Sequence, residues 1–162
     1  MESSRRSFIK RAIALGTSVS TVNAGSTSVR AQPSGIRSFD HVALPMRNVD
    51  AMVSFYRALG CLVNEGAQIC SVHFGTQMIN LHRPVLWQSA AFTLRAPAAN
   101  PPCGDLCFVW DGTPDSLKAT LDKAGAKVVT GPVNRQGGRR TTGSSVYVRD
   151  PDENLLEFII YS

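Results

Sequence analysis

The chain has 162 residues, of which 43% are hydrophobic and 18% charged, so it is long enough for one globular domain and too apolar for wholesale disorder. The sequence contains no run of about 18 apolar residues, which excludes an ordinary membrane-spanning helix. The net charge of +5 lies mainly at the N-terminus, since residues 1–31 hold five basic residues against Glu2 alone, and the near-neutral remainder removes the electrostatic case for nucleic-acid binding.

The first 35 residues differ from the rest and are rich in Ser, Thr, Ala and Arg. A twin-arginine export signal is indicated by Ser4–Lys10 (SRRSFIK), and the mildly apolar stretch 12–29 that follows it is typical of such signals. Arg-rich, acid-poor leaders are also typical of mitochondrial presequences, which is the alternative. We therefore expect residues 1–35 to be a cleavable targeting leader of an exported, periplasmic protein, with the folded domain at 36–162.

The folded part begins with a pattern of one strand, one helix and three strands. Residues 39–44 alternate as in a strand. Asp50 is the expected N-cap of a helix that Gly60 ends, and apolar residues recur between them at helical spacing. Short strands are then predicted at 61–64, 68–74 and 77–82.

The same order recurs in the second half. A strand is predicted at 105–110, followed by a helix that begins at Thr113-Pro114 and ends at Gly125. Strands at 127–130, 144–149 and 154–161 complete the unit, with a turn at 150–153.

Both helices start and stop at positions 65 residues apart, which indicates a duplicated βαβββ module, about 38–83 and 104–162. The Pro-containing segment 84–103 links the two modules. One module alone leaves one face of its sheet bare, and pairing two modules covers such a face.

These motifs resemble the vicinal oxygen chelate superfamily, which includes glyoxalases, fosfomycin-resistance enzymes, extradiol dioxygenases and bleomycin-resistance proteins. The resemblance rests on the strand FDHV at 39–42, the helix FYRALG at 55–60 and the ending DPDENLLE at 150–157. The stretches FGTQMINLH at 74–82 and GPV at 131–133 are similar to glyoxalase domain-containing protein 5-like proteins. The implied fold class is α+β, with two βαβββ modules forming a cupped, partly open eight-stranded barrel-like sheet.

The resemblance also implies a divalent metal ion (Zn, Ni, Mn, Co or Fe) held by the first and last strands of the modules. On this basis His41, Asp105 and Glu157 are the expected ligands, and Asn80 stands where glyoxalase I has a carboxylate. Imidazole and carboxylate donors with open positions suit such a cation. Independently, Glu157 lies in an apolar strand, where a carboxylate is costly unless it is paired or bound to metal.

Further site residues are expected near this centre. Glu157 is also the expected catalytic base, and His82, two residues beyond Asn80, is a second catalytic candidate that shares its face. Arg135 and Arg139, in the glycine-rich segment 131–143, would bring guanidinium groups to an anionic substrate in a mobile loop, and a solvated flexible loop is the alternative. Trp110 is a candidate for an apolar substrate pocket, with core packing as the alternative.

The expected function is that of a metal-dependent lyase or isomerase of glyoxalase type, acting on a small molecule with two adjacent oxygens. An extradiol-dioxygenase-like enzyme and a metal-free, ligand-sequestering protein are the alternatives. A homodimer is expected, since members of the superfamily are often dimers. The four cysteines permit disulfides without indicating a pairing, and Cys107, in an apolar run, is expected to be a buried, inert thiol.

Overall fold

The computed structural model describes residues 35–161, and the fold lies in a compact unit that begins at Ser38. The predicted leader at 1–35 falls almost wholly outside the described residues. Among the residues described, no helix has the length and apolar character needed to cross a membrane.

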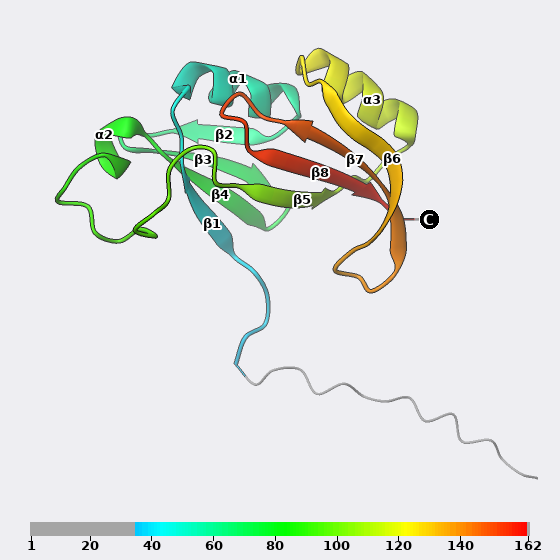
Figure 1. Cartoon of the computed structure of the whole chain (residues 1–162), viewed down its shortest axis with the longest axis horizontal. Helices are drawn as coiled ribbons and strands as arrows, with labels where there is room; N and C mark the ends of the chain where they lie inside the picture. Colours follow the sequence, from blue (N-terminus) through cyan, green and yellow to red (C-terminus); the bar gives the residue numbers. More distant parts are fainter. Residues whose placement is uncertain (1–34, 162) are drawn as a thin grey trace, which may run out of the picture. The chain divides into compact units, whose positions relative to one another are not determined.

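Each half of the compact unit consists of a strand, a helix and three further strands (Figure 1). The first half contains β1 (His41–Pro45), α1 (Val49–Ala58), β2 (Leu62–Glu65), β3 (Ile69–Phe74) and β4 (Gln77–His82). The second half contains β5 (Asp105–Val109), α3 (Pro114–Lys123), β6 (Val128–Gln136), β7 (Thr142–Arg149) and β8 (Leu155–Ile160). A short helix, α2 (Pro84–Trp87), lies in the connection between them. The predicted pair of βαβββ modules is confirmed.

Each module forms its own four-stranded mixed sheet. The strand orders are β1-β4-β3-β2 and β5-β8-β7-β6, so the first strand of each module is an edge strand that runs parallel to the last. The α+β class is therefore confirmed. The eight strands form two separate sheets and are not closed into a barrel, an arrangement that is compatible with a cup.

The helices begin and end for local reasons. The sequence predicts a helix start at Thr113-Pro114, and in the structure Thr113 caps α3 by accepting a hydrogen bond from the backbone N–H of Ser116. Gly60 follows α1 with a φ of +90°, a conformation that favours glycine. The predicted N-cap of α1 was wrong: Asn48 holds that position, and Asp50 lies in the first turn, where its charge still stabilises the helix dipole.

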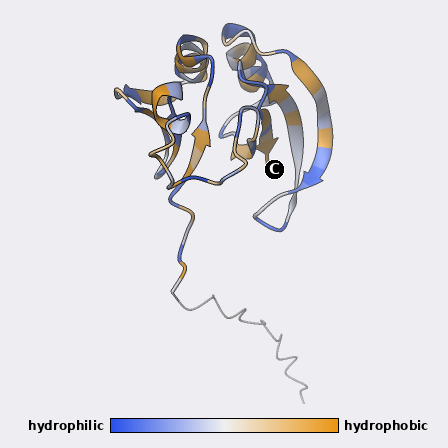
Figure 2. Ribbon diagram, turned by 60° about the vertical axis from the view of Figure 1, so that its left-hand side comes forward, coloured by the Kyte–Doolittle hydropathy of each residue, from blue (hydrophilic) through white to orange (hydrophobic). Residues whose placement is uncertain are grey.

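The helices cover one face of each sheet and leave the other face without a helix (Figure 2). Alternate residues of the strands pack with the apolar sides of α1 and α3 in a single core. On the helix side these residues include Val72, Ile79, Val148, Leu156 and Phe158. The intervening residues form what we call the helix-free face of each sheet.

A buried turn at the end of β7 joins the two modules. Asp152 is 3% exposed, and its carboxylate accepts the backbone N–H groups of Arg47 and Asn48 at the start of α1. Asp150 accepts a hydrogen bond from the hydroxyl of Tyr56 on α1, with 3.2 Å between the oxygens. The turn predicted between the last two strands thus also fixes the first helix of the other module.

Asn154 ties the same turn to the connection between modules. Its Oδ1 accepts the backbone N–H groups of Cys103 and Gly104 at 3.0 and 2.8 Å, and its amide donates to Asp150 at 2.9 Å. Because Asn154 is 1% exposed, water cannot replace these partners freely.

One predicted loop is largely strand. Residues 131–136 continue β6, and β7 already begins at Thr142. The strand tolerates Gly131-Pro132 because β6 is an edge strand and its pairing with β7 shifts register between Thr130 and Val133. The turn between the strands is therefore shorter than the predicted loop.

We expect Asn154→Ala to destabilise the protein by about 2–4 kcal/mol, because it leaves the backbone N–H groups of Cys103 and Gly104 without partners and removes one donor to the buried Asp150 carboxylate. Urea unfolding of the full chain measures this. The matched control is Asn100→Ala, since Asn100 is exposed and its amide meets only the Ala98 carbonyl at 3.3 Å. The control should change stability by less than about 0.5 kcal/mol. Equal effects of the two substitutions would contradict a structural role for Asn154.

Candidate functional site

Glu157 lies on the helix-free face of the second sheet, in a row of three side chains. The strand register places it between Tyr147 of β7 and Cys107 of β5. Asp105 belongs to the next row along β5. The carboxylate that the sequence places in an apolar strand is therefore on the open side of that strand, while its neighbours Leu156 and Phe158 face the core.

Hydroxyl groups hold the Glu157 carboxylate. The Ser145 hydroxyl donates to its Oε1 at 2.5 Å, and the Tyr147 hydroxyl is also hydrogen-bonded to it. Arg135 donates from Nε to the Tyr147 hydroxyl oxygen at 3.1 Å, and its guanidinium carbon lies 5.7 Å from the centre of the ring. A connected chain thus runs from Arg135 through Tyr147 to Glu157. Arg135, which the sequence predicts in a mobile loop, lies in strand β6 and contacts Tyr147, not Glu157 itself.

Cys107 corrects a prediction. Its side chain is exposed on the helix-free face beside Glu157, where a buried thiol was expected. The apolar run of β5 misled the prediction because successive side chains of an edge strand point to opposite faces. Desolvation by surrounding protein atoms and the charge of Glu157 raise the pKa of this thiol to about 12. All four cysteines of the chain are free thiols.

The first module presents an equivalent row. Asn80 of β4 lies between Ser71 of β3 and Ala43 of β1, and the Ser71 hydroxyl donates to its Oδ1 at 2.9 Å. Ala43 pairs with Asn80 as Cys107 pairs with Glu157, so Asn80 and Glu157 occupy matching positions in the two modules.

His41 and Asp105 match in the same way. Each lies two residues before its module's central row, on the first strand and on the helix-free face. The Nδ1 atom of His41 lies 2.6 Å from a carboxylate oxygen of Asp40, which leaves Nε2 free of hydrogen bonds to the residues described. Both His41 and Asp105 are exposed.

Within one chain the expected metal ligands are on two different sheets. His41 belongs to the first sheet, and Asp105 and Glu157 belong to the second. Among residues 35–161, no three side chains of His, Cys, Asp or Glu are gathered closely enough to hold a metal ion. The structure therefore places each predicted ligand on a helix-free face without assembling the set in one chain.

The other predicted site residues are distributed over the domain. Arg139 lies over the ring of Tyr161, with 4.9 Å from the guanidinium carbon to the ring centre, next to the end of β8. His82 lies at the end of β4 on the helix-free face, and its ring packs edge-on against Phe92 of the connection at 5.3 Å. Burial lowers the pKa of His82. It lies one row beyond Asn80.

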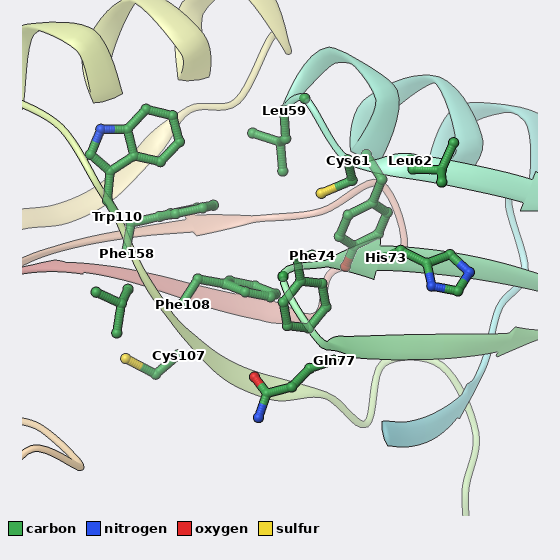
Figure 3. Close-up of a pocket in the computed structure, with 14 residues that line it drawn as sticks. Leu59, Cys61, Leu62, His73, Phe74, Gln77, Cys107, Phe108, Trp110 and Phe158 are labelled. Atoms are coloured by element: carbon green, nitrogen blue, oxygen red, sulfur yellow. The ribbon is translucent and has the colours of Figure 1, made fainter. Parts of the chain in front are cut away.

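Trp110 directly follows β5 and packs edge-on against Phe158 of the core. Its Nε1 donates to the Ser116 hydroxyl at 3.0 Å, and its ring lines a cavity of about 720 Å³ between the modules. In this cavity Phe74 and Phe108 meet edge to face, with ring centres 5.1 Å apart (Figure 3). Cys107 also lines this cavity. The cavity therefore extends to the β5 residue that pairs with Glu157.

Comparison with protein families agrees with this architecture. The profile of the Glyoxalase/Bleomycin resistance protein/Dioxygenase superfamily matches residues 38–158. The chain belongs to this superfamily. The match includes both modules, and with them the positions of His41, Asn80, Asp105 and Glu157.

Two curated proteins are similar to this chain in sequence. Glyoxalase domain-containing protein RDO1 of Mycosarcoma maydis is 36% identical over 127 residues, covering 78% of this chain and 69% of the relative. Virulence protein STM3117 of Salmonella typhimurium is 34% identical over 134 residues, covering 78% of this chain and 85% of the relative.

Solved structures of similar proteins have the same fold. The crystal structure of STM3117 matches with a TM-score of 0.69 and 32% identity, covering 78% of this chain and 97% of that chain. Lactoylglutathione lyase from Agrobacterium tumefaciens matches with a TM-score of 0.57 and 23% identity, covering 78% and 95% of the two chains. At this lower identity the second likeness shows the fold alone.

The contact between Cys107 and Glu157 predicts a slow thiol. In chelator-treated protein at pH 8, we expect iodoacetamide to alkylate Cys107 on the order of a thousandfold more slowly than an ordinary thiol, because few molecules carry the thiolate. Glu157→Gln removes a negative charge and should raise the rate about tenfold, which corresponds to one pKa unit. The desolvation of the thiol by neighbouring protein atoms remains, so the rate should stay below that of an ordinary thiol.

Peptide mass spectrometry over time measures the rate at each cysteine. Glu153→Gln is the matched control, since this exposed glutamate lies in the turn before β8. The interpretation is wrong if Cys107 reacts at the same rate in wild-type protein and Glu157→Gln, or if the control accelerates it equally.

Proposed function

We propose that the protein is a metal-dependent enzyme of glyoxalase type, a lyase or isomerase that acts on a small molecule with two adjacent oxygens. The observation that carries the proposal is the Glu157 carboxylate, held by Ser145 and Tyr147 on an open sheet face. The hydrogen bond from Ser145 fixes this carboxylate where a ligand on the open face can reach it. Membership of the superfamily and the likeness to a glyoxalase domain-containing relative support the reaction class.

The donor atoms fit a divalent cation. The Asp40 carboxylate next to Nδ1 of His41 is the arrangement that orients a metal-binding imidazole and leaves Nε2 as the ligand atom. Asp105 and Glu157 add carboxylate oxygens, and the mixed set suits Zn, Ni, Mn, Co or Fe. His41, Asp105 and Glu157 would hold the ion, which when bound would polarise the two substrate oxygens as a Lewis acid.

The protein's own groups would manage the proton. The Ser145 hydroxyl fixes one oxygen of Glu157 and leaves the other as the expected acceptor of a substrate proton. Tyr147 fixes the carboxylate from the neighbouring strand, and Arg135 keeps the Tyr147 hydroxyl directed toward it. The guanidinium also supplies positive charge for an anionic substrate. His82 and Arg139 lie farther along the two faces and would contact the substrate away from the reacting carbon.

A second copy of the chain would complete this site. His41 and Glu157 lie on different sheets of one chain, and both helix-free faces are open. In a two-fold symmetric dimer, the first module of each chain can face the second module of its partner, which would form two equivalent sites. We therefore propose a homodimer with shared sites, and export by the twin-arginine-like leader.

A metal-free, ligand-sequestering protein is the second candidate. The separation of the donors within one chain favours it, because open polar faces can bind a ligand without an ion. An extradiol-dioxygenase-like site would want a second imidazole beside His41 and Glu157, and His82 packs under the connection instead.

Mixing two defective variants tests the shared metal site. His41→Ala and Glu157→Gln should each lose Zn²⁺ binding as separate homodimers. After subunit exchange, half of the dimers are mixed and each contains one intact site, so the mixture should regain about a quarter of the wild-type stoichiometry. Equilibrium dialysis with metal analysis measures the bound zinc. His73→Ala is the matched control, because His73 is hydrogen-bonded to Asn64 and is not an expected ligand.

Recovery of zinc binding supports a site between two chains. Wild-type binding without recovery in the exchanged mixture would place the site within one chain and contradict the dimer proposal. Wild-type protein that binds no zinc, nickel, manganese, cobalt or iron would overturn the metal-dependent proposal in favour of the ligand-sequestering one.

A further inference from the structure

A small cavity lies under the connection between the modules, beside the helix-free face of the first sheet. Its volume is about 70 Å³. It is lined by Ala43, Pro45, His82, Arg95, Ala96 and Ala99. Two of these residues carry hydrogen-bonding side chains, and the others provide small apolar walls. The polar groups of the cavity are therefore the side chains of His82 and Arg95, and its volume is too small for a sugar or an aromatic ring.

His82 is a buried imidazole with no partner among the residues described. It is 8% exposed, and none of the hydrogen bonds found in residues 35–161 involves its ring nitrogens. Because burial lowers its pKa, the ring is neutral near pH 7 and presents one N–H donor. The edge-on contact with Phe92 holds the ring in place. Within residues 35–161 the fully buried side-chain polar atom without a partner is Arg83 Nε, so the unpartnered ring nitrogens of His82 are accessible at the cavity.

Arg95 brings a cation to the same cavity. Its side chain is half-buried, and one nitrogen, Nη1, donates to the Ala99 carbonyl at 3.3 Å. None of the ion pairs within residues 35–161 includes Arg95, so the guanidinium has no carboxylate partner in the described chain. A guanidinium and an imidazole N–H that line one cavity are the donors that bind a carboxylate.

We propose that this cavity binds the carboxylate group of a small organic acid, with Arg95 and His82 as the donors. The volume admits a carboxylate with few attached carbons, and the alanine side chains leave that room. The pairing of β1 with β4 places His82 two residues beyond Asn80, which is about 7 Å along the strand.

The cavity therefore indicates a substrate class. A short-chain acid with its carboxylate in the cavity would extend its other oxygens toward the row of Asn80. This assignment to the substrate rests on the proposed function, whereas carboxylate binding by the cavity does not.

The test uses full-length, chelator-treated protein with isotope-labelled histidine and two probes, propionate and its neutral isostere propionamide. Nuclear magnetic resonance follows the ring signals of His82, which His82→Gln assigns by their loss. We expect saturable shifts with propionate, with a dissociation constant on the order of 1–10 mM, and none of comparable size with propionamide. Absence of saturable shifts with propionate, or an equal response to the amide, would overturn the proposal.

Two variants locate the binding. Arg95→Gln should raise the dissociation constant for propionate at least about tenfold by removing the charge. Arg57→Gln is the matched control, because Arg57 pairs with Glu65 on another part of the surface, and it should leave the constant unchanged. Ala96→Leu, at an exposed position, should fill the cavity and abolish the response while the fold is retained. Wild-type affinity in both Arg95→Gln and Ala96→Leu would place the anion elsewhere and refute the assignment.

These measurements contain no metal, so they separate this inference from the proposed function. Loss of the proposed zinc site would leave the propionate titration intact. Absence of propionate binding would remove the carboxylate subsite and leave the zinc experiment unaffected.

Discussion

The turn from Asp150 to Asn154 holds the two modules in one arrangement, and every candidate site residue depends on it. Asp152 fixes the start of α1, and Asn154 fixes the connection at Gly104. These side chains are buried, so their hydrogen bonds cannot be exchanged for water without loss of the surrounding packing. The turn therefore does more than reverse the chain between β7 and β8: it specifies how the sheets are placed relative to each other.

This arrangement buries the helix sides of both sheets and leaves their other faces open. The open faces carry exposed apolar side chains as well as Glu157. Leu62 is 64% exposed and Val109 is 48% exposed, and both lie on these faces. A sheet face that mixes a held carboxylate with exposed apolar side chains is suited to a partner surface or a ligand. Because the helix-free faces of a single chain are exposed, they are free to pair with those of a second chain, as the proposed metal site between two chains requires.

The sequence predicted local features well and contacts between modules poorly. Strand β4, the start of α3 at Thr113-Pro114 and the position of Gly60 depend on neighbouring residues, and the structure confirms all three. The partners of Asn154 lie about fifty residues away, and no spacing rule identifies them. Cys107 was misjudged because an apolar run does not reveal that its strand lies at a sheet edge. The hydroxyl of Tyr147 on Glu157 depends on strand register, which the sequence did not specify.

The two modules have diverged in charge while they keep the same register. Asn80 is neutral and bonded to Ser71, whereas the matching Glu157 carries a charge and is bonded to Ser145. His41 and Asp105 differ in the same sense, with the carboxylate again in the second module. In the proposed site both carboxylates would come from one chain and the imidazole from the other. Two carboxylates balance one divalent cation, so such a site would bind the ion without net charge and leave recognition of an anionic substrate to Arg135 and the Arg95 cavity.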